Sequence, residues 1–113
     1  MNLSIRSEQV DRTYHIHLAG EIDAYTAPQL RESLLPLAEK EDYEINIHLD
    51  EVEYIDSTGL GVFVGVLKAT DANGSNLTLL GMSSRIRRLF TITGLDEVIT
   101  IKGAKEGRIN GTT

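Results

Sequence analysis

The chain has 113 residues, which is close to the commonest size of a single domain and enough to bury one modest core. Its formal charge of −6 and pI near 4.9 argue against nucleic acid as a partner, because phosphates require a basic surface. The absence of cysteine excludes disulfides and thiolate metal sites. The sequence has no signal-peptide pattern and no apolar run of the roughly 18 residues that cross a bilayer. We therefore expect one cytoplasmic domain spanning residues 1–113.

The first half of the chain predicts two strands, a helix and a third strand. Residues 3–6 and 14–18 alternate apolar and polar side chains, which is typical of two half-buried strands in a hairpin. A helix is expected to begin at Thr26, whose hydroxyl would cap it, with a proline in the first turn. Pro36 lies inside this helix, so we expect a kink or an early end there. Residues 45–49 alternate again and predict the next strand.

The second half repeats this alternation of helix and strand. Residues 60–72 form a long apolar run that ends at Asn73 and Gly74, two residues that tolerate the left-handed conformation of helix ends. Residues 77–80 predict a further strand. Ser83 or Ser84 is expected to cap a helix that ends near a glycine, and residues 98–101 predict a short last strand.

The predicted fold is α/β, with a small mixed sheet of four to five strands. Helices that link parallel strands require right-handed crossovers, and strands that alternate rather than run continuously apolar indicate helices mainly on one face. The other face then collects polar side chains, namely Arg6, His15, His17, Asn46, His48 and Thr78. Residues 102–113 have few apolar side chains and are expected to form a loosely ordered tail.

The most informative stretch is the one that joins the third predicted strand to the second helix. Asp56, Ser57 and Thr58 each carry an oxygen that can accept an unpaired amide hydrogen of the first helical turn, so a cap is the simplest interpretation of Ser57. The free amides and the helix dipole also favour an anion at this position. A phosphate on Ser57 is therefore compatible with the fold and would add roughly −1.5 to −2 charges beside Asp56.

Glycines follow this entrance at regular spacing. Gly61 and Gly65 lie four residues apart, on one side of the predicted helix, where they would allow its backbone to approach the sheet or a neighbouring helix. Together with Gly59, these glycines miss the spacing of a dinucleotide-binding motif by one residue. They do not make a phosphate loop either, because no Gly-Lys-Ser/Thr sequence follows.

Catalytic interpretations of the same stretch are not supported. An aspartic protease needs a second copy of its Asp motif, and a serine hydrolase would have glycine where Ile55 stands. The three histidines fall in strand interiors with no carboxylate or cysteine motif beside them, so no metal is predicted. Arg85, Arg87 and Arg88 form a basic cluster that is either a solvated helix face or a secondary docking surface.

Three blocks of the sequence resemble the STAS domain family, and within it the stand-alone anti-sigma factor antagonists of bacteria. They are GEIDAYTAP at residues 20–28, YIDSTGLGVF at 54–63 and IRRLFTITGL at 86–95. The resemblance spans nearly the whole chain and is closest to the general stress response branch. It implies a phosphoprotein that regulates transcription without being an enzyme and without a cofactor.

The resemblance also implies partner switching. The unphosphorylated protein would bind an anti-sigma factor that is a serine kinase and so release the sigma factor, until the kinase phosphorylates Ser57. A metal-dependent serine phosphatase would restore the antagonist. The partner-binding positions carried over onto this sequence are Asp23, Asp56, Thr58, Gly59 and Leu60. The alternative is a ligand- or nucleotide-sensing STAS module within a larger signalling assembly.

Overall fold

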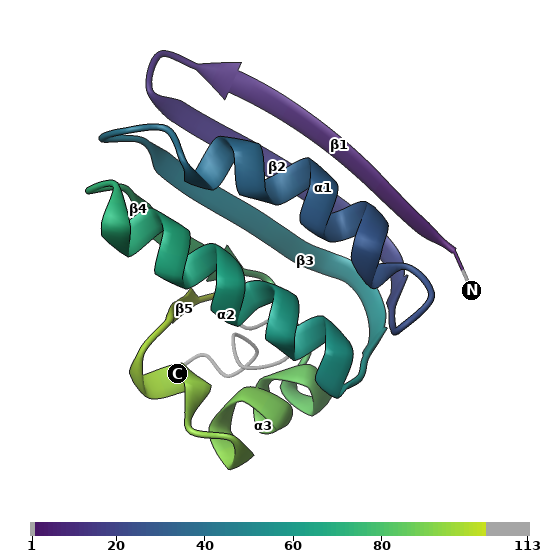
Figure 1. Ribbon diagram of the computed structural model, residues 1–113. Coiled ribbons are helices and arrows are strands. Elements are labelled where there is room, and N and C mark those ends of the chain that lie inside the picture. Colours follow the sequence, from purple (N-terminus) through teal and green to yellow (C-terminus); the bar gives the residue numbers. More distant parts are fainter. Residues whose placement is uncertain (1, 104–113) are drawn as a thin grey trace.

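A computed structural model describes residues 2–103, and within them strands and helices alternate after an initial hairpin (Figure 1). The strands are β1 (Leu3–Val10), β2 (Thr13–Ile22), β3 (Glu44–Ile55), β4 (Asn76–Leu80) and β5 (Thr100–Lys102). The helices are α1 (Ala27–Ala38), α2 (Ser57–Ala72) and α3 (Ser84–Ile92), with a short 3₁₀ helix η1 (Leu95–Glu97). None of these helices is long and apolar enough to cross a membrane.

The strands form one mixed sheet in the order β1-β2-β3-β4-β5. β1 and β2 are antiparallel, as a hairpin requires, whereas β2, β3, β4 and β5 are mutually parallel. Each parallel neighbour is reached through a helix. The predicted α/β class and mixed sheet are confirmed.

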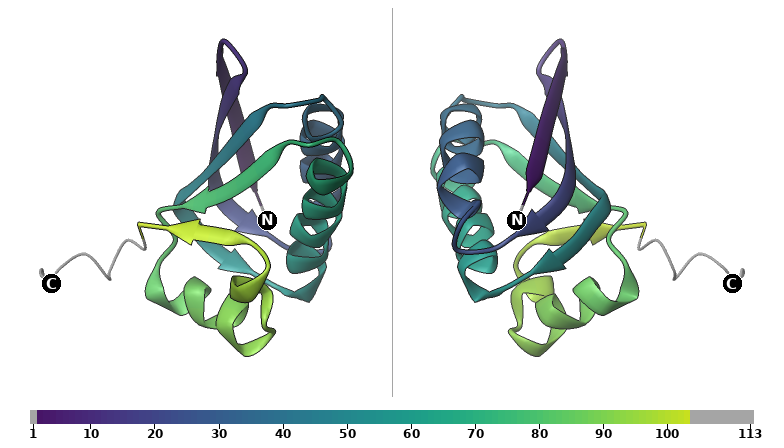
Figure 2. Two further views of the ribbon diagram at one scale, coloured as in Figure 1. Left: turned by 90° about the vertical axis from the view of Figure 1, so that its left-hand side faces the viewer. Right: turned by 90° about the vertical axis from the view of Figure 1, so that its right-hand side faces the viewer.

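Helices α1 and α2 lie side by side across one face of the sheet, and α3 lies near one end of it (Figure 2). The alternating strands direct their apolar side chains toward the helices, so Ile16, Ile47 and Leu79 are fully buried. Phe63 of α2 and Phe90 of α3 meet with ring centroids 6.2 Å apart. The opposite face remains largely open, as the alternation predicted.

The first helix differs in two details from its prediction. Thr26 is the residue before the helix, but its hydroxyl does not cap it, because this hydroxyl donates to the carbonyl of Glu21 and accepts from the amide of Asp23. The predicted early end at Pro36 is also wrong, since α1 continues to Ala38. Proline removes only one amide donor, and burial of Leu34 and Ala38 outweighs that loss.

The second half follows the predictions closely, except near its end. α2 ends at Ala72, before Asn73 and Gly74, and the Ser83 hydroxyl caps α3 by accepting from the amide of Ile86 at 3.2 Å. Gly94 adopts the left-handed conformation, with φ of 79°. The last strand begins at Thr100, later than predicted, because the amides of Val98 and Ile99 donate back to the carbonyl of Leu95, the first residue of η1. Of the predicted loose tail, Lys102 instead ends β5, and residues 104–113 lie outside the described residues.

Candidate functional site

The candidate site lies at the edge of the sheet where two parallel strands end side by side. Ile22 at the end of β2 pairs with Ile55 at the end of β3, and the Asp56 amide donates to the Ile22 carbonyl at 3.1 Å. Asp23 and Asp56 therefore leave the sheet from adjacent positions. Ser57 follows immediately as the first residue of α2.

Asp56, and not Ser57, caps α2. Its backbone is extended, with φ of −106° and ψ of −174°, and its Oδ1 accepts from the Gly59 amide at 3.1 Å. The interpretation of Ser57 as the helix cap is therefore wrong. The carboxylate already satisfies an amide of the first turn and places a negative charge at the positive end of the helix dipole.

The side chains of Ser57 and Thr58 are exposed to solvent. The Ser57 hydroxyl makes no hydrogen bond to any described residue, because the capping role belongs to its neighbour. The exposed Ser57 hydroxyl therefore has no hydrogen bond within the described residues to lose on modification.

Asp23 is 9% exposed and serves the turn between β2 and α1. Its Oδ1 accepts from the amides of Tyr25 at 2.9 Å and Thr26 at 3.0 Å. These bonds tie Asp23 to the local backbone. The same turn leaves the Tyr25 side chain 82% exposed, beyond the carboxylate that shapes the turn.

Gly59 and Leu60 are buried on the inner side of α2. A Cβ on Gly59 would lie 2.6 Å from Cγ2 of Ile22 and 3.1 Å from Cγ2 of Ile55, whereas one on Gly61 would meet nothing within 4 Å. A Cβ on Gly65 would lie 3.8 Å from Nη1 of Arg31, an ordinary contact, so the predicted close approach at Gly61 and Gly65 is wrong. Gly59 is the residue that lets the first turn of α2 lie against the strand ends.

A protein-family model described as the STAS domain matches residues 4–106. The chain belongs to the STAS domain family. The anti-sigma-B factor antagonist of Listeria monocytogenes is 50% identical to this STAS domain over 112 residues, covering 98% of this chain and 97% of the other. Among solved structures, an anti-sigma factor antagonist from Mycobacterium paratuberculosis superposes with a TM-score of 0.81 at 21% identity, covering 97% and 93% of the two chains.

A second solved structure is SpoIIAA of Bacillus in its phosphorylated form. It superposes on this STAS domain with a TM-score of 0.67 at 24% identity, covering 92% of this chain and 96% of the other. At these identities the two structural likenesses establish the fold, which is the STAS-like fold expected from the sequence.

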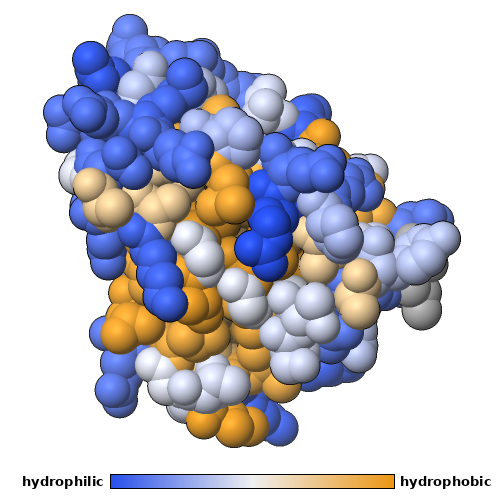
Figure 3. Space-filling model, viewed as in Figure 1, coloured by the Kyte–Doolittle hydropathy of each residue, from blue (hydrophilic) through white to orange (hydrophobic). Residues whose placement is uncertain are grey.

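Acidic and aromatic side chains precede Ser57 at the end of β3, and exposed apolar side chains lie at the end of α3 and just after η1. Glu53 is exposed, and Tyr54 is 50% exposed at the end of β3. On the helix face, apolar surface gathers in the lower part of the view, where α3 lies (Figure 3). Ile92 and Val98 contribute exposed apolar side chains beside that helix, at 72% and 60% exposure. No exposed apolar surface was predicted from the sequence at these two positions.

The other residue clusters singled out in the sequence lie away from this edge or are solvated. Arg85 and Arg88 are exposed on α3, and Arg87 is half-buried. His15, His17 and His48 do share the open face of the sheet, as predicted. Within residues 2–103, no three or more His, Cys, Asp or Glu side chains are grouped so that they could hold a metal ion.

Proposed function

We propose that this STAS domain is an anti-sigma factor antagonist of the cytoplasm that works by partner switching. In its unphosphorylated form it binds an anti-sigma factor that is a serine kinase, and the sigma factor held by that kinase is released. The kinase phosphorylates Ser57, which ends the binding, and a metal-dependent serine phosphatase reverses the modification. The domain itself supplies no catalysis.

The observation that carries this proposal is the division of roles between Asp56 and Ser57. Asp56 caps the helix, so modification of the exposed Ser57 removes no hydrogen bond that the described part of the fold uses. A phosphate at the first position of α2 also faces the positive end of the helix dipole. We therefore expect the phosphorylated domain to stay folded.

The same phosphate changes what the surface can bind. It adds roughly −1.5 to −2 charges to an edge that already carries Asp56 and the exposed Glu53. A partner surface that fits the neutral hydroxyl would have to desolvate this charge without a matching cation, which costs several kcal/mol. Binding is therefore expected to fail through charge rather than through unfolding.

The remaining partner-binding residues divide by burial. Thr58 is exposed and is proposed to contact the kinase directly. Gly59, Leu60 and Asp23 are buried, so their proposed contribution is to hold the start of α2 and the adjacent turn in the shape that the kinase recognises. The half-buried Asp56 combines both roles, as the cap and as a charge beside Ser57.

Relatives support the assignment of a partner class. The protein from Listeria monocytogenes carries the name anti-sigma-B factor antagonist and aligns over nearly the whole of both chains. The Bacillus relative of the same fold exists in a phosphorylated form. Together with the exposed serine, these relatives favour regulation by phosphorylation.

The test has two parts: incubation with the candidate kinase and ATP followed by mass spectrometry of the peptides, and a separate pull-down of the kinase by the unmodified domain without ATP. We expect one phosphate on Ser57 of the wild type and none in Ser57→Ala. In the pull-down, the wild type and Ser57→Ala should retain the kinase and Ser57→Asp should retain it weakly. Ser7→Ala is the matched control, because it removes an exposed serine hydroxyl on β1, outside the candidate site, and should leave phosphorylation of Ser57 intact. Phosphate on Thr58 instead, or equal retention of Ser57→Asp, would contradict the proposal.

A further inference from the structure

All three histidines of the chain gather on the open face of the sheet, on the side opposite α1 and α2. His15 Nδ1 and His48 Nε2 are 3.1 Å apart, which is a hydrogen-bond distance. The ring of His17 stacks on that of His48, with centroids 4.4 Å apart and planes 9° from parallel. Neighbouring strands β2 and β3 are thus joined by imidazole contacts at their centre.

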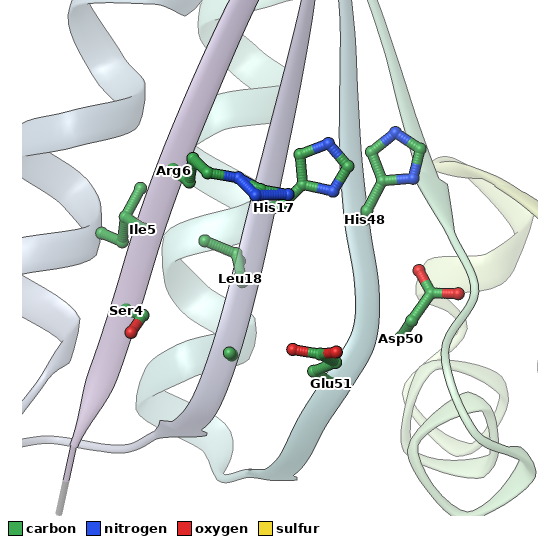
Figure 4. A pocket seen from close by; sticks show the side chains of 9 residues that line it. Ser4, Ile5, Arg6, His17, Leu18, His48, Asp50 and Glu51 are labelled. Carbon is green, nitrogen blue, oxygen red and sulfur yellow. The ribbon is translucent and has the colours of Figure 1, made fainter.

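The cluster is open to water and protons. Arg6, His17 and His48 line an open hollow of about 690 Å³, with Asp50 and Glu51 further along β3 (Figure 4). All three rings are half-buried. Protons can therefore reach the cluster, while each ring is partly shielded from the solvent that would otherwise separate like charges.

The hydrogen bond sets a limit on protonation. One nitrogen of the pair formed by His15 and His48 must accept, and an imidazolium has only donors. A proton on each ring would therefore break this bond and place two positive charges close together. A third charge, on His17 stacked on His48, would add to the repulsion.

Other charged groups facing the cluster offset this repulsion only in part. From β1, Glu8 Oε1 lies 4.0 Å from His17 Nε2, and Arg6 pairs in register with His17. On β3 itself Asp50 attracts a proton toward His48. On the other side His48 pairs with the uncharged Leu80 of β4, and Lys102 of β5 pairs with Leu80 and adds positive charge. The cluster thus has two carboxylates, Glu8 and Asp50, for three imidazoles.

We propose that the three histidines form a proton-sensitive cluster that weakens the centre of the sheet as the pH falls below neutrality. Because β2 and β3 lead directly to Asp23 and Asp56, weakening this strand pair also reduces the population of domain with an intact candidate site. The proposal concerns the stability of the fold and does not depend on the partner proposed above.

The direction of the pKa shift of His48 agrees with this geometry. Burial lowers the pKa of His48 below its ordinary value of 6.5, and the neighbouring His17 and His15 lower it further. The unfolded chain therefore takes up a proton at this site more readily than the folded domain. The stability that the folded domain gains by holding His48 neutral is complete above pH 6.5. It is lost as the pH falls from 6.5 through the lower pKa of His48 in the folded domain. Each unit of separation between the two pKa values increases the unfolding equilibrium constant up to about tenfold.

The direct test is NMR titration of the three imidazole Cε1–H signals in the wild-type domain between about pH 8 and pH 5. We expect the midpoint of His48 to lie below 6.5 and to rise in His15→Gln and His17→Gln, since each removes a neighbouring charge. A His48 midpoint at or above 6.5 in the wild type would overturn the proposal, and so would a midpoint that neither substitution moves.

The second test is urea unfolding at about pH 8, 7 and 6, where histidine is the main side chain that titrates. The wild type should be about equally stable at pH 8 and 7 and less stable at pH 6, and the triple variant His15→Gln, His17→Gln, His48→Gln should lose most of this dependence. Asn46→Ala is the matched control, because Asn46 pairs with His15 on the same face but does not titrate. It should change the overall stability and keep the wild-type pH dependence. An undiminished pH dependence in the triple variant, or a flattened one in the control, would contradict the mechanism; if the triple variant does not fold, the single variants are used.

Discussion

Replacing Gly59 and Gly61 separately by alanine should change stability in opposite directions. Both residues lie in α2, where alanine is favoured over glycine by about 0.5–1 kcal/mol because it restricts the unfolded chain. A Cβ on Gly61 meets nothing within 4 Å, so Gly61→Ala should stabilise the domain by about that amount.

At Gly59 the same gain is outweighed by steric overlap. The new Cβ would lie 2.6 Å from Cγ2 of Ile22 and 3.2 Å from the Ile22 carbonyl oxygen, and Ile22 is fully buried, so neither can retreat easily. Overpacking of this kind costs about 1–3 kcal/mol. Alanine at position 59 also gains the same helix propensity as alanine at position 61, which offsets part of this cost. We therefore expect Gly59→Ala to lower the free energy of unfolding by roughly 0.5–2 kcal/mol.

Urea unfolding followed by circular dichroism measures both variants, with equal m-values as the check that the unfolded states are comparable. Because the two substitutions share the propensity term, the difference between them isolates the steric contact of Gly59 with the strand ends. Equal stabilisation by both variants would refute the packing argument. It would also remove the reason for assigning Gly59 a positioning role next to Ser57.

Three further predictions concern α1 and α2. Asp56→Ala removes the cap of α2 and should lower the free energy of unfolding by about 0.5–2 kcal/mol in urea titration, whereas Thr58→Ala should change it much less; equal losses would contradict the assignment of the cap. Ser57→Asp should leave the thermal midpoint unchanged or slightly higher, most clearly at low salt, because the new charge faces the positive end of the helix; a large decrease would mean that Ser57 is structurally required. Pro36→Ala should raise stability by about 1–3 kcal/mol, since it restores an amide donor inside α1; a loss would show that the proline ring is needed for packing.

The sequence predicted the class and order of the fold because most of its elements carry a local signal. Period-two alternation marked the strands, and Asn73, Gly74 and Gly94 marked helix ends through their backbone preferences. The position of the last strand was less accurate, because η1 is a single short turn that has no periodicity of its own.

The details of the site were harder to predict, since they depend on tertiary contacts. Asp56, Ser57 and Thr58 are equally good caps by type, and only the end of β3 decides that Asp56 takes the role. Gly61 and Gly65 have the regular spacing, yet the strand ends approach α2 at Gly59. Three histidines in strand interiors predicted a shared face, but their hydrogen bond and stacking follow from the register of β2 against β3.

The most direct test of the account is calorimetric titration of the candidate kinase with this domain in three states. These are the unmodified domain, the domain carrying phosphoserine at position 57, and the latter after treatment with a serine phosphatase. We predict tight binding by the first, binding weaker by at least about tenfold, or 1.4 kcal/mol, for the second, and full recovery in the third. Equal affinity of the unmodified and phosphorylated domains, with both folded by circular dichroism, would contradict a charge switch at Ser57.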